Sequence, residues 1–344
     1  MSRIPILNVY YVLCYAWKHW EAGDTVRRNR LDRLETVQDL LAKILSQGIF
    51  QLIRTGLDRG FSEIHEDIAG VRGRIDLAQT TKRALRAKGQ IACVYEELSH
   101  DVLHNQMLRA TLRHLLRLPN LDHKVRGDVR KGYLKLAGIS DIHLNRRTFG
   151  QVVLDRNRRN YRFLLSVCQL IYDQLLVDET SGQATFREVS DSRLAQLFED
   201  FVIGFYQSEQ HKYAVNKKGR RIRWNKGDMP ASSVAAVPRM EADVILEAPD
   251  KRIIMDTKFY EETLGGRIGG KLRSNHLYQL LAYLRNREAT VPAPVRHDGI
   301  LLYPTVDQHV DISVCLEGFN IRATTINLGQ PWKQIRNDLL GVLP

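Results

Sequence analysis

Two aspartates and a lysine stand in a short stretch that otherwise has the composition of β-strands. Residues 240–260 read MEADVILEAPDKRIIMDTKFY, in which twelve residues separate Asp243 from Asp256 and Lys258 follows two residues later. Mg²⁺ prefers carboxylate oxygens as ligands. A metal ion held by two carboxylates activates a bound water and polarises phosphate oxygens, and a nearby lysine can orient the water or offset developing charge. These residue types therefore indicate Mg²⁺-dependent phosphodiester hydrolysis.

A β-hairpin would bring the two aspartates together. Two β-rich apolar runs flank residues 249–250, a Pro-Asp pair typical of turns. A hairpin centred on that pair places Asp243 opposite Asp256, and Glu241 opposite Lys258. Directly opposed Cβ atoms lie about 5 Å apart, where like charges destabilise each other, so a cation is expected between the aspartates. The alternative is a surface hairpin with solvated charges and a register that differs by one residue.

Predicted helices on both sides of the hairpin carry polar residues that would complete such a site. Residues 191–206 (DSRLAQLFEDFVIGFY) have an apolar stripe at helical spacing, with Glu199 near its edge. Residues 274–286 (SNHLYQLLAYLRN) form a second amphipathic pattern. Gln279 and Tyr283 are four residues apart on it and therefore share one side of the helix.

The order helix, hairpin, helix and then a strand at residues 298–304 (DGILLYP) resembles the core of a PD-(D/E)xK nuclease. That core usually carries a Glu on its first helix, an Asp, an Asp-x-Lys and a Gln-x-x-x-Tyr helix. The matching residues here are Glu199, Asp243, Asp256, Lys258, Gln279 and Tyr283. Taken alone, Gln279 and Tyr283 are more simply explained as polar residues on the surface of a helix. Within the order of elements above, they become supporting residues of the site.

Seven stretches spread over nearly the whole chain indicate a resemblance to one particular family of nucleases. They are IPILNVYYVLCYAW, GVRGRIDLAQT, LHNQMLRATL, VPRMEADV, IIMDTKFY, NHLYQLLAYL and INLGQPW, and they run from residue 4 to residue 332. They resemble McrC proteins, the nuclease subunits of McrBC modification-dependent restriction systems. In this resemblance Asp243, Asp256 and Lys258 fall on the catalytic motif of the family, with the two aspartates as Mg²⁺ ligands.

The resemblance also implies a protein partner. In the family a separate AAA+ GTPase, McrB, forms hexameric rings, and the N-terminal domain of the nuclease subunit docks on the ring, reaches into its pore and stimulates hydrolysis. Recognition of 5-methylcytosine would lie in that partner, because the chain shows no reader motif. Residues 265–272 (GGRIGGKL) nearly match a phosphate-binding loop, but Leu272 lacks the hydroxyl that would ligate Mg²⁺. This chain is therefore not expected to bind nucleotides.

The charge of the chain favours a polyanionic partner such as double-stranded DNA. It has 51 lysines and arginines against 39 acidic residues, a net charge of +12. Residues 216–227 (NKKGRRIRWNKG), just before the hairpin, carry six basic residues and no acid. We expect this run to contact phosphates, with solvated surface charge as the alternative. The DNA-binding candidates are Lys217, Lys218, Arg220, Arg221 and Arg223.

The chain is long enough for two domains. Residues 1–157 show no catalytic constellation and are predicted to be an α+β partner-docking domain, followed by an α/β PD-(D/E)xK endonuclease domain at residues 158–344. Helices are expected near residues 6–20, 32–58 and 101–118. The basic, strand-rich segment from Ile64 to Glu97 is the candidate for the projection into the partner.

Four cysteines, Cys14, Cys93, Cys168 and Cys315, lie far apart without a CxxC motif. A zinc site or a disulfide framework is therefore not expected, and a reducing cytoplasm fits this pattern. The apolar N-terminal stretch is interrupted by polar residues, and no run reaches the roughly 18 apolar residues of a membrane span.

Together these patterns predict the endonuclease subunit of a GTP-dependent, 5-methylcytosine-specific restriction complex that cleaves DNA with Mg²⁺. Two alternatives stay open: a non-catalytic activator and DNA clamp of an AAA+ partner, or a stand-alone DNA repair nuclease. The intact motif residues count against the first alternative. The large N-terminal half without catalytic chemistry counts against the second.

Overall fold

The computed structural model describes residues 4–17, 34–154, 158–177, 184–186, 191–216, 220–225, 236–259, 273–290, 295–306 and 309–344. Lys217, Lys218 and the glycine-rich segment 265–272 lie outside the described residues. The chain divides into two compact units. We call residues 1–37 with 188–344 the sheet unit, and residues 38–187 the helical unit.

This division differs from the predicted boundary after residue 157, because the N-terminal helix α1 (Ile6–Ala16) packs in the sheet unit. Nδ2 of Asn8 donates to the carbonyls of Leu328 and Gln330, at 2.8 Å each. Gly204 on α8 (Asp191–Glu209) approaches α1 so closely that a Cβ there would lie 2.0 Å from the carbonyl oxygen of Tyr15. The first helix of the chain is thus part of the C-terminal core.

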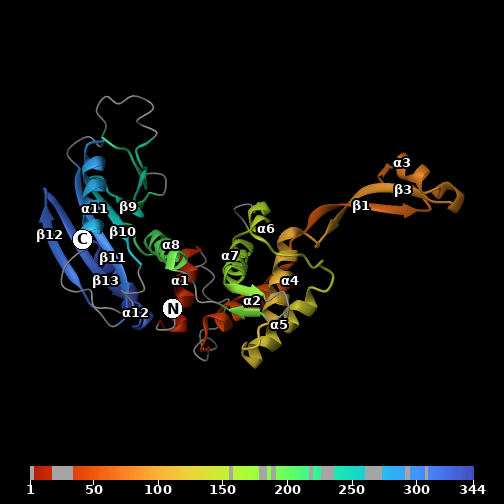
Figure 1. The fold of residues 1–344 in the computed structure, drawn as a ribbon, viewed down its shortest axis with the longest axis horizontal. Coiled ribbons are helices and arrows are strands. Elements are labelled where there is room, and N and C mark those ends of the chain that lie inside the picture. The colour runs from red at the N-terminus through yellow and green to blue at the C-terminus, as the bar shows by residue number, and fades with distance from the viewer. Residues whose placement is uncertain are drawn as a thin grey trace. The chain divides into compact units, whose positions relative to one another are not determined.

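A six-stranded sheet forms the centre of the sheet unit, in the order β12-β13-β11-β10-β9-β6 (Figure 1). Its strands are β6 (Ala214–Val215), β9 (Val244–Glu247), β10 (Lys251–Thr257), β11 (Arg296–Thr305), β12 (Asp311–Leu316) and β13 (Phe319–Asn327). β10, β11 and β13 run parallel, whereas β9 and β12 pair antiparallel with their neighbours. This mixed α/β unit has the predicted order of helix, hairpin, helix and strand.

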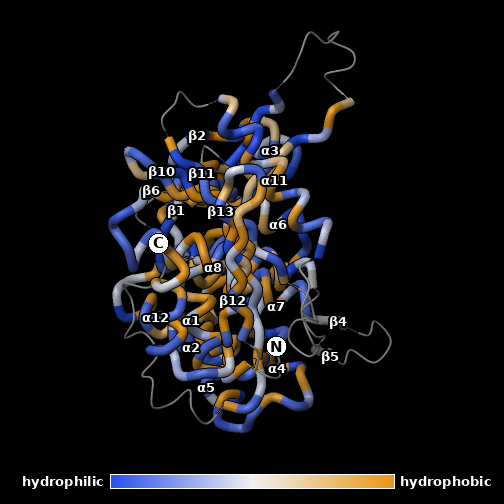
Figure 2. The backbone as a smooth tube through the Cα atoms, turned by 90° about the vertical axis from the view of Figure 1, so that its left-hand side faces the viewer, coloured by the Kyte–Doolittle hydropathy of each residue, from blue (hydrophilic) through white to orange (hydrophobic). Residues whose placement is uncertain are grey.

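Helices cover the sheet on both faces. On one face Leu280 and Leu284 of α11 (Ser274–Glu288) pack with Ile254 of β10 in one buried cluster. Ile253 and Met255 point to the other face, since side chains alternate along a strand, and both are fully buried. Helices α8 and α12 (Trp332–Val342) contact strands of the sheet. Figure 2 shows the hydrophobic residues gathered along α1 and α8.

The predicted hairpin and its register are confirmed. Ile254 pairs with Ile245, and Met255 pairs with Val244, which is the register of a turn centred on residues 249–250. The N–H of Ala248 closes this turn by donating to the carbonyl of Lys251 at 2.8 Å.

In the part of the helical unit that the structure describes, four longer helices pack with a short one. They are α2 (Val37–Thr55), α4 (Leu103–Leu116), α5 (His123–Lys135), α7 (Arg159–Gln174) and the short α6 (Arg146–Gln151), with the strand pair β4 (Leu175–Val177) and β5 (Ala184–Phe186). Gly48 on α2 lies against Leu164 on α7, where a Cβ would come within 2.3 Å of a leucine methyl. The helices predicted near residues 32–58 and 101–118 are confirmed.

A three-stranded arm at residues 60–99 extends outward from the helices of this unit (Figure 1). It consists of β1 (Gly60–Ile68), β2 (Arg74–Ile75), α3 (Leu77–Lys82), the 3₁₀-helix η3 (Leu85–Lys88) and β3 (Ile91–Ser99). Phe61 and Leu98 are paired across β1 and β3, and their side chains are 73% and 49% exposed. The predicted strand-rich character of residues 64–97 is confirmed, because β1, β2 and β3 overlap this segment. The exposed pair Phe61 and Leu98 flanks it on either side.

All four cysteines are free thiols. Among the residues that the structure describes, no helix combines the length and the apolar character needed to cross a membrane.

Candidate active site

A chain of polar contacts joins the end of β10 to α11. Asp256 is 1% exposed, and its Oδ2 lies 2.6 Å from Nζ of Lys258. The same ammonium donates to Oε1 of Gln279 at 2.9 Å. Nε2 of Gln279 in turn donates to the hydroxyl of Tyr283 at 2.6 Å. The structure thus brings together Asp256, Lys258, Gln279 and Tyr283 in one connected site.

Asp243 lies at a bend just before β9, beside Asp256. Its Oδ2 accepts the N–H of Thr257 at 2.7 Å and the Thr257 hydroxyl at 2.8 Å. In a continued hairpin that N–H would face residue 242, but the carboxylate of Asp243 takes its place. The strand pairing therefore ends at Val244 and Met255.

The predicted placement of Glu241 opposite Lys258 is wrong for this reason. Glu241 belongs to the short strand β8 (Met240–Glu241), which turns away from β10 and pairs with β7 (Arg221–Ile222). The N–H of Lys258 instead donates to the carbonyl of Leu302 on β11 at 2.9 Å.

Glu199 on α8 supplies a third carboxylate. Its Oε1 contacts the guanidinium of Arg220, whose Nε also donates to the carbonyl of Ala242 at 2.9 Å. Burial raises the pKa of Glu199 to about 7, and the charge of Asp243 adds to this rise, while Arg220 opposes it. Glu199 therefore lies within the electrostatic reach of Asp243.

The described arginines of the basic run at residues 216–227 have different surroundings. Arg220, predicted as a DNA contact, turns towards Glu199 and Ala242. Arg221 and Arg223 are exposed, as the predicted phosphate contacts require. Their role in DNA binding stays a prediction.

The pKa of Asp256 reflects its buried place beside a second carboxylate. Burial and, to a smaller extent, the charge of Asp243 raise this pKa to about 6, and the ammonium of Lys258 only partly offsets both. A carboxylate with a raised pKa gains from any additional cation, because the ionised form then becomes more favourable.

The residues present fit a hard divalent cation such as Mg²⁺. The donors are carboxylate oxygens, and Thr257 fixes the orientation of Asp243. Within the described residues, no group of three or more His, Cys, Asp and Glu side chains is arranged to hold a metal ion. Asp243 and Asp256 would then hold the ion, with water and substrate oxygens completing its shell, which is usual for Mg²⁺.

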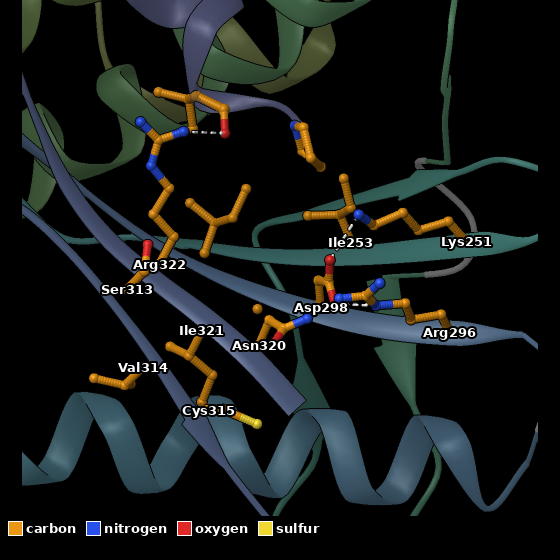
Figure 3. Close-up of a pocket in the computed structure, with 14 residues that line it drawn as sticks. Lys251, Ile253, Arg296, Asp298, Ser313, Val314, Cys315, Asn320, Ile321 and Arg322 are labelled. Carbon is orange, nitrogen blue, oxygen red and sulfur yellow. Dashed lines mark hydrogen bonds and ion pairs between the residues drawn. The ribbon is translucent and has the colours of Figure 1, made fainter. Parts of the chain in front are cut away.

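A pocket of about 570 Å³ in the sheet unit is a separate feature (Figure 3). Lys251 and Arg296, which line it, begin β10 and β11, whereas Asp256 lies near the other end of β10. Asp298 lies 2.7 Å from Nζ of Lys251 and 3.2 Å from Nε of Arg296. Asp298 is the one Asp or Glu side chain among the residues that line this pocket, against Lys251, Arg296 and Arg322, so the pocket offers no pair of side-chain carboxylates for metal chemistry.

Sequence reasoning missed two residues of the site. Thr257 is the unspecified residue of the Asp-x-Lys pattern, and no spacing rule marks its double contact with Asp243. His276 on α11 is buried, and its Nδ1 lies 3.0 Å from the hydroxyl of Tyr303. Burial lowers the pKa of His276 to about 4, with smaller contributions from Lys258 and Arg273, so this histidine is neutral.

Comparison with known proteins agrees with the resemblance found in the sequence. Residues 13–304 match the family described as McrBC 5-methylcytosine restriction system component. The chain is 30% identical over 344 residues to the type IV methyl-directed restriction enzyme EcoKMcrBC of Escherichia coli (strain K12), covering 98% of this chain and 97% of that protein.

The fold is similar to that of a chain in a solved structure, with a TM-score of 0.55 and 17% sequence identity. That structure is the refined half-complex from a tetradecameric assembly of Thermococcus gammatolerans McrB AAA+ hexamers with bound McrC, and the match covers 98% of this chain and 76% of that one. From the family match and the extent of its identity to the Escherichia coli relative, the chain belongs to the family of McrBC 5-methylcytosine restriction system components.

Proposed function

We propose that the chain is the endonuclease subunit of a GTP-dependent, 5-methylcytosine-specific restriction complex, and that Asp243, Asp256 and Lys258 carry out the cleavage. The observation that carries this proposal is the meeting of two carboxylates and an ammonium at the end of β10, with Lys258 held by both Asp256 and Gln279. When bound, Mg²⁺ would activate a water and polarise the scissile phosphate.

The residues of this chain have distinct roles in that reaction. Asp243 and Asp256 would hold the ion, and the two hydrogen bonds from Thr257 keep Asp243 turned towards the site. Lys258 is 15% exposed, and its position between Asp256 and Gln279 directs its ammonium to the place where negative charge develops on phosphate. Tyr283 fixes Gln279 from the next turn of α11.

An AAA+ GTPase of the McrB type is the proposed partner, as in the assembly of the structural neighbour. The arm is the part of the helical unit that we propose for its contact. Phe61 and Leu98 face each other across β1 and β3 and are 73% and 49% exposed, while Val71 and Leu77 elsewhere in the arm are 65% and 62% exposed. Exposed apolar side chains of this kind commonly mark an interaction site. Recognition of methylated cytosine belongs to the partner in this proposal.

The test compares the chain alone with the chain plus its GTPase partner on methylated and unmethylated double-stranded DNA. Cleavage should require the partner, GTP, Mg²⁺ and methylation together, and should disappear in Asp256→Ala. Cleavage by the chain alone would favour a stand-alone repair nuclease. GTPase stimulation without any cleavage would favour the non-catalytic activator and clamp.

A further inference from the structure

Arg220 connects two parts of the candidate site. Its Nε donates to the carbonyl of Ala242 at 2.9 Å, and its guanidinium contacts Oε1 of Glu199. The main-chain carbonyl of Arg220 also accepts the N–H of Ala242 at 2.9 Å. Because Ala242 directly precedes Asp243, Arg220 positions the segment that carries one proposed ligand as well as the carboxylate of Glu199.

This guanidinium serves Glu199 as a fixed counter-ion. The side chains of Arg220 and Glu199 are each 23% exposed, so water screens the pair only in part. Arginine stays protonated throughout the accessible pH range. A metal ion that recruited Glu199 would have to break this pair and leave a partly buried guanidinium without its partner, which is unfavourable.

Asp243 is the residue that a second metal ion would share. Arg220 contacts both Glu199 and the carbonyl of Ala242, the residue directly before Asp243, so Glu199 and Asp243 lie on either side of this guanidinium. Phosphodiester hydrolysis can use one metal ion or two ions about 3.5–4 Å apart. Within the described residues, however, three carboxylates are not arranged around a common ion.

We infer that Arg220 restricts the free protein to one metal ion, between Asp243 and Asp256, by holding Glu199 out of a second coordination shell. This inference rests on the proposed function, since it assumes that the two aspartates bind metal. Arg220 is in this view a positioning residue that sets the number of ions bound, and a phosphate contact is not its main role.

The experiment counts Mn²⁺ ions bound per full-length chain, from the free Mn²⁺ signal in electron paramagnetic resonance. It is carried out above the pH range in which Glu199 titrates. We expect one ion for the wild type and two for Arg220→Gln, which keeps a hydrogen-bond donor near Ala242 but removes the charge. Arg220→Lys, which restores the charge, and the double variant Arg220→Gln/Glu199→Gln should each return to one ion. The exposed Arg239→Gln is the matched control and should bind one.

Two ions in the wild type, or one ion in a folded Arg220→Gln chain, would overturn the inference. If Arg220→Gln does not fold, Glu199→Gln decides the question: unchanged binding of one ion supports the role of Arg220, and weakened binding shows that Glu199 is already a ligand. Absence of Mn²⁺ binding in the wild type, or wild-type binding by Asp256→Ala, would instead overturn the proposed metal site itself.

Discussion

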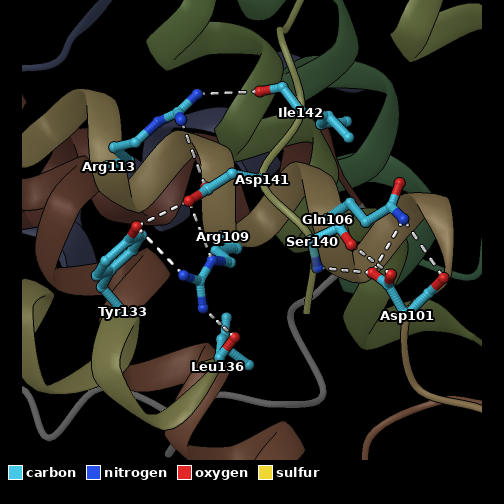
Figure 4. A network of polar contacts seen from close by, with 9 residues as sticks. All are labelled: Asp101, Gln106, Arg109, Arg113, Tyr133, Leu136, Ser140, Asp141 and Ile142. Atoms are coloured by element: carbon cyan, nitrogen blue, oxygen red, sulfur yellow. Dashed lines mark hydrogen bonds and ion pairs between the residues drawn. The ribbon is translucent and has the colours of Figure 1, made fainter. Parts of the chain in front are cut away.

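Two aspartates of the helical unit and the carboxylates of the candidate site in the sheet unit all lie among arginines and lysines, but their pKa values move in opposite directions. In the helical unit, Asp141 accepts from the hydroxyl of Tyr133 at 2.8 Å and lies 3.4 Å from Nε of Arg109 (Figure 4). Asp101 accepts from the N–H and the hydroxyl of Ser140, at 2.7 and 2.6 Å. Burial opposes ionisation at both, yet these donors and cations hold both pKa values below the ordinary one.

At the candidate site of the sheet unit, burial and the repulsion between carboxylates prevail. The pKa of Asp256 rises to about 6 and that of Glu199 to about 7, even though each carboxylate contacts a cation. The carboxylates of the helical unit therefore stabilise the ionised folded protein. The ionised carboxylates of the candidate site instead reduce the stability of the folded protein, and an additional cation at the site would be bound favourably.

The largest expected effect comes from Asp256. Asp256→Asn should lower DNA cleavage at least about a hundredfold, because it removes a charge on which the proposed metal site depends. In metal-free buffer at neutral pH the same variant should unfold at a higher temperature than the wild type, because it removes a repelled, buried charge. Gel-based cleavage with the partner and thermal unfolding in chelator measure the two effects.

Asp250→Asn is the matched control for this variant. Asp250 lies exposed in the turn of the same hairpin, so neither cleavage nor thermal stability should change noticeably. Wild-type cleavage by Asp256→Asn would contradict the site assignment.

Removing the charge of Asp141 should lower the stability of the chain, whereas removing that of Asp256 should raise it. Asp141→Asn weakens contacts with Tyr133, Arg109 and Arg113, and should destabilise the chain by about 1–2 kcal/mol. Urea unfolding followed by circular dichroism measures the loss. The exposed Glu96→Gln is the control and should leave the unfolding midpoint unchanged. If Asp141→Asn and Glu96→Gln unfold at the same urea concentration, Asp141 does not stabilise the chain, and its contrast with Asp256 is lost.

Asp256 of the candidate site should also differ from Asp101 and Asp141 of the helical unit in its response to pH when no metal is present. Asp256 titrates at about 6 in the folded chain, above its ordinary value of 3.8, so its contribution to stability is complete below the ordinary value and is lost as pH rises through about 6. Asp101 and Asp141 have lowered pKa values, so their contribution is present above the ordinary value and is lost as pH falls.

Tryptophan fluorescence separates the two responses, because Trp17, Trp20, Trp224 and Trp332 all belong to the sheet unit. On going from neutral pH to about pH 5, the fluorescence midpoint in urea should rise relative to that of Asp256→Asn. A difference between the two midpoints that stays constant over this range would show that Asp256 does not carry the effect.

The smallest expected effect on stability is at the arm. Replacing Phe61 and Leu98 by Ser should change the free energy of unfolding by no more than about 0.5 kcal/mol, since both side chains are already exposed. Stimulation of GTP hydrolysis by the partner should nevertheless fall several-fold. The exposed Leu134→Ser, on α5 of the same unit, is the matched control, and equal stimulation by all variants would exclude the arm from the contact.

The hairpin could be predicted from sequence because its turn residues and its apolar alternation act locally. The orientation of Arg220 could not be predicted, since a basic run looks the same whether one of its residues faces water or the half-buried Glu199. The boundary between the sheet unit and the helical unit could not be predicted from the sequence for a related reason. The contacts of Asn8 with Leu328 and Gln330 join residues more than three hundred positions apart, and no local pattern reports them.

The place of α1 in the C-terminal core has a consequence for the order in which a ribosome completes the molecule. The helical unit is an insertion in the sheet unit, and its 38–187 segment takes about 10–30 s to emerge at ordinary rates of synthesis. During that interval α1, with its buried Leu13 and Tyr15, has neither α8 nor Trp332 to pack against. The helical unit can therefore be complete while the sheet with Asp243 and Asp256 does not yet exist, and an interrupted chain would carry the arm without the carboxylates.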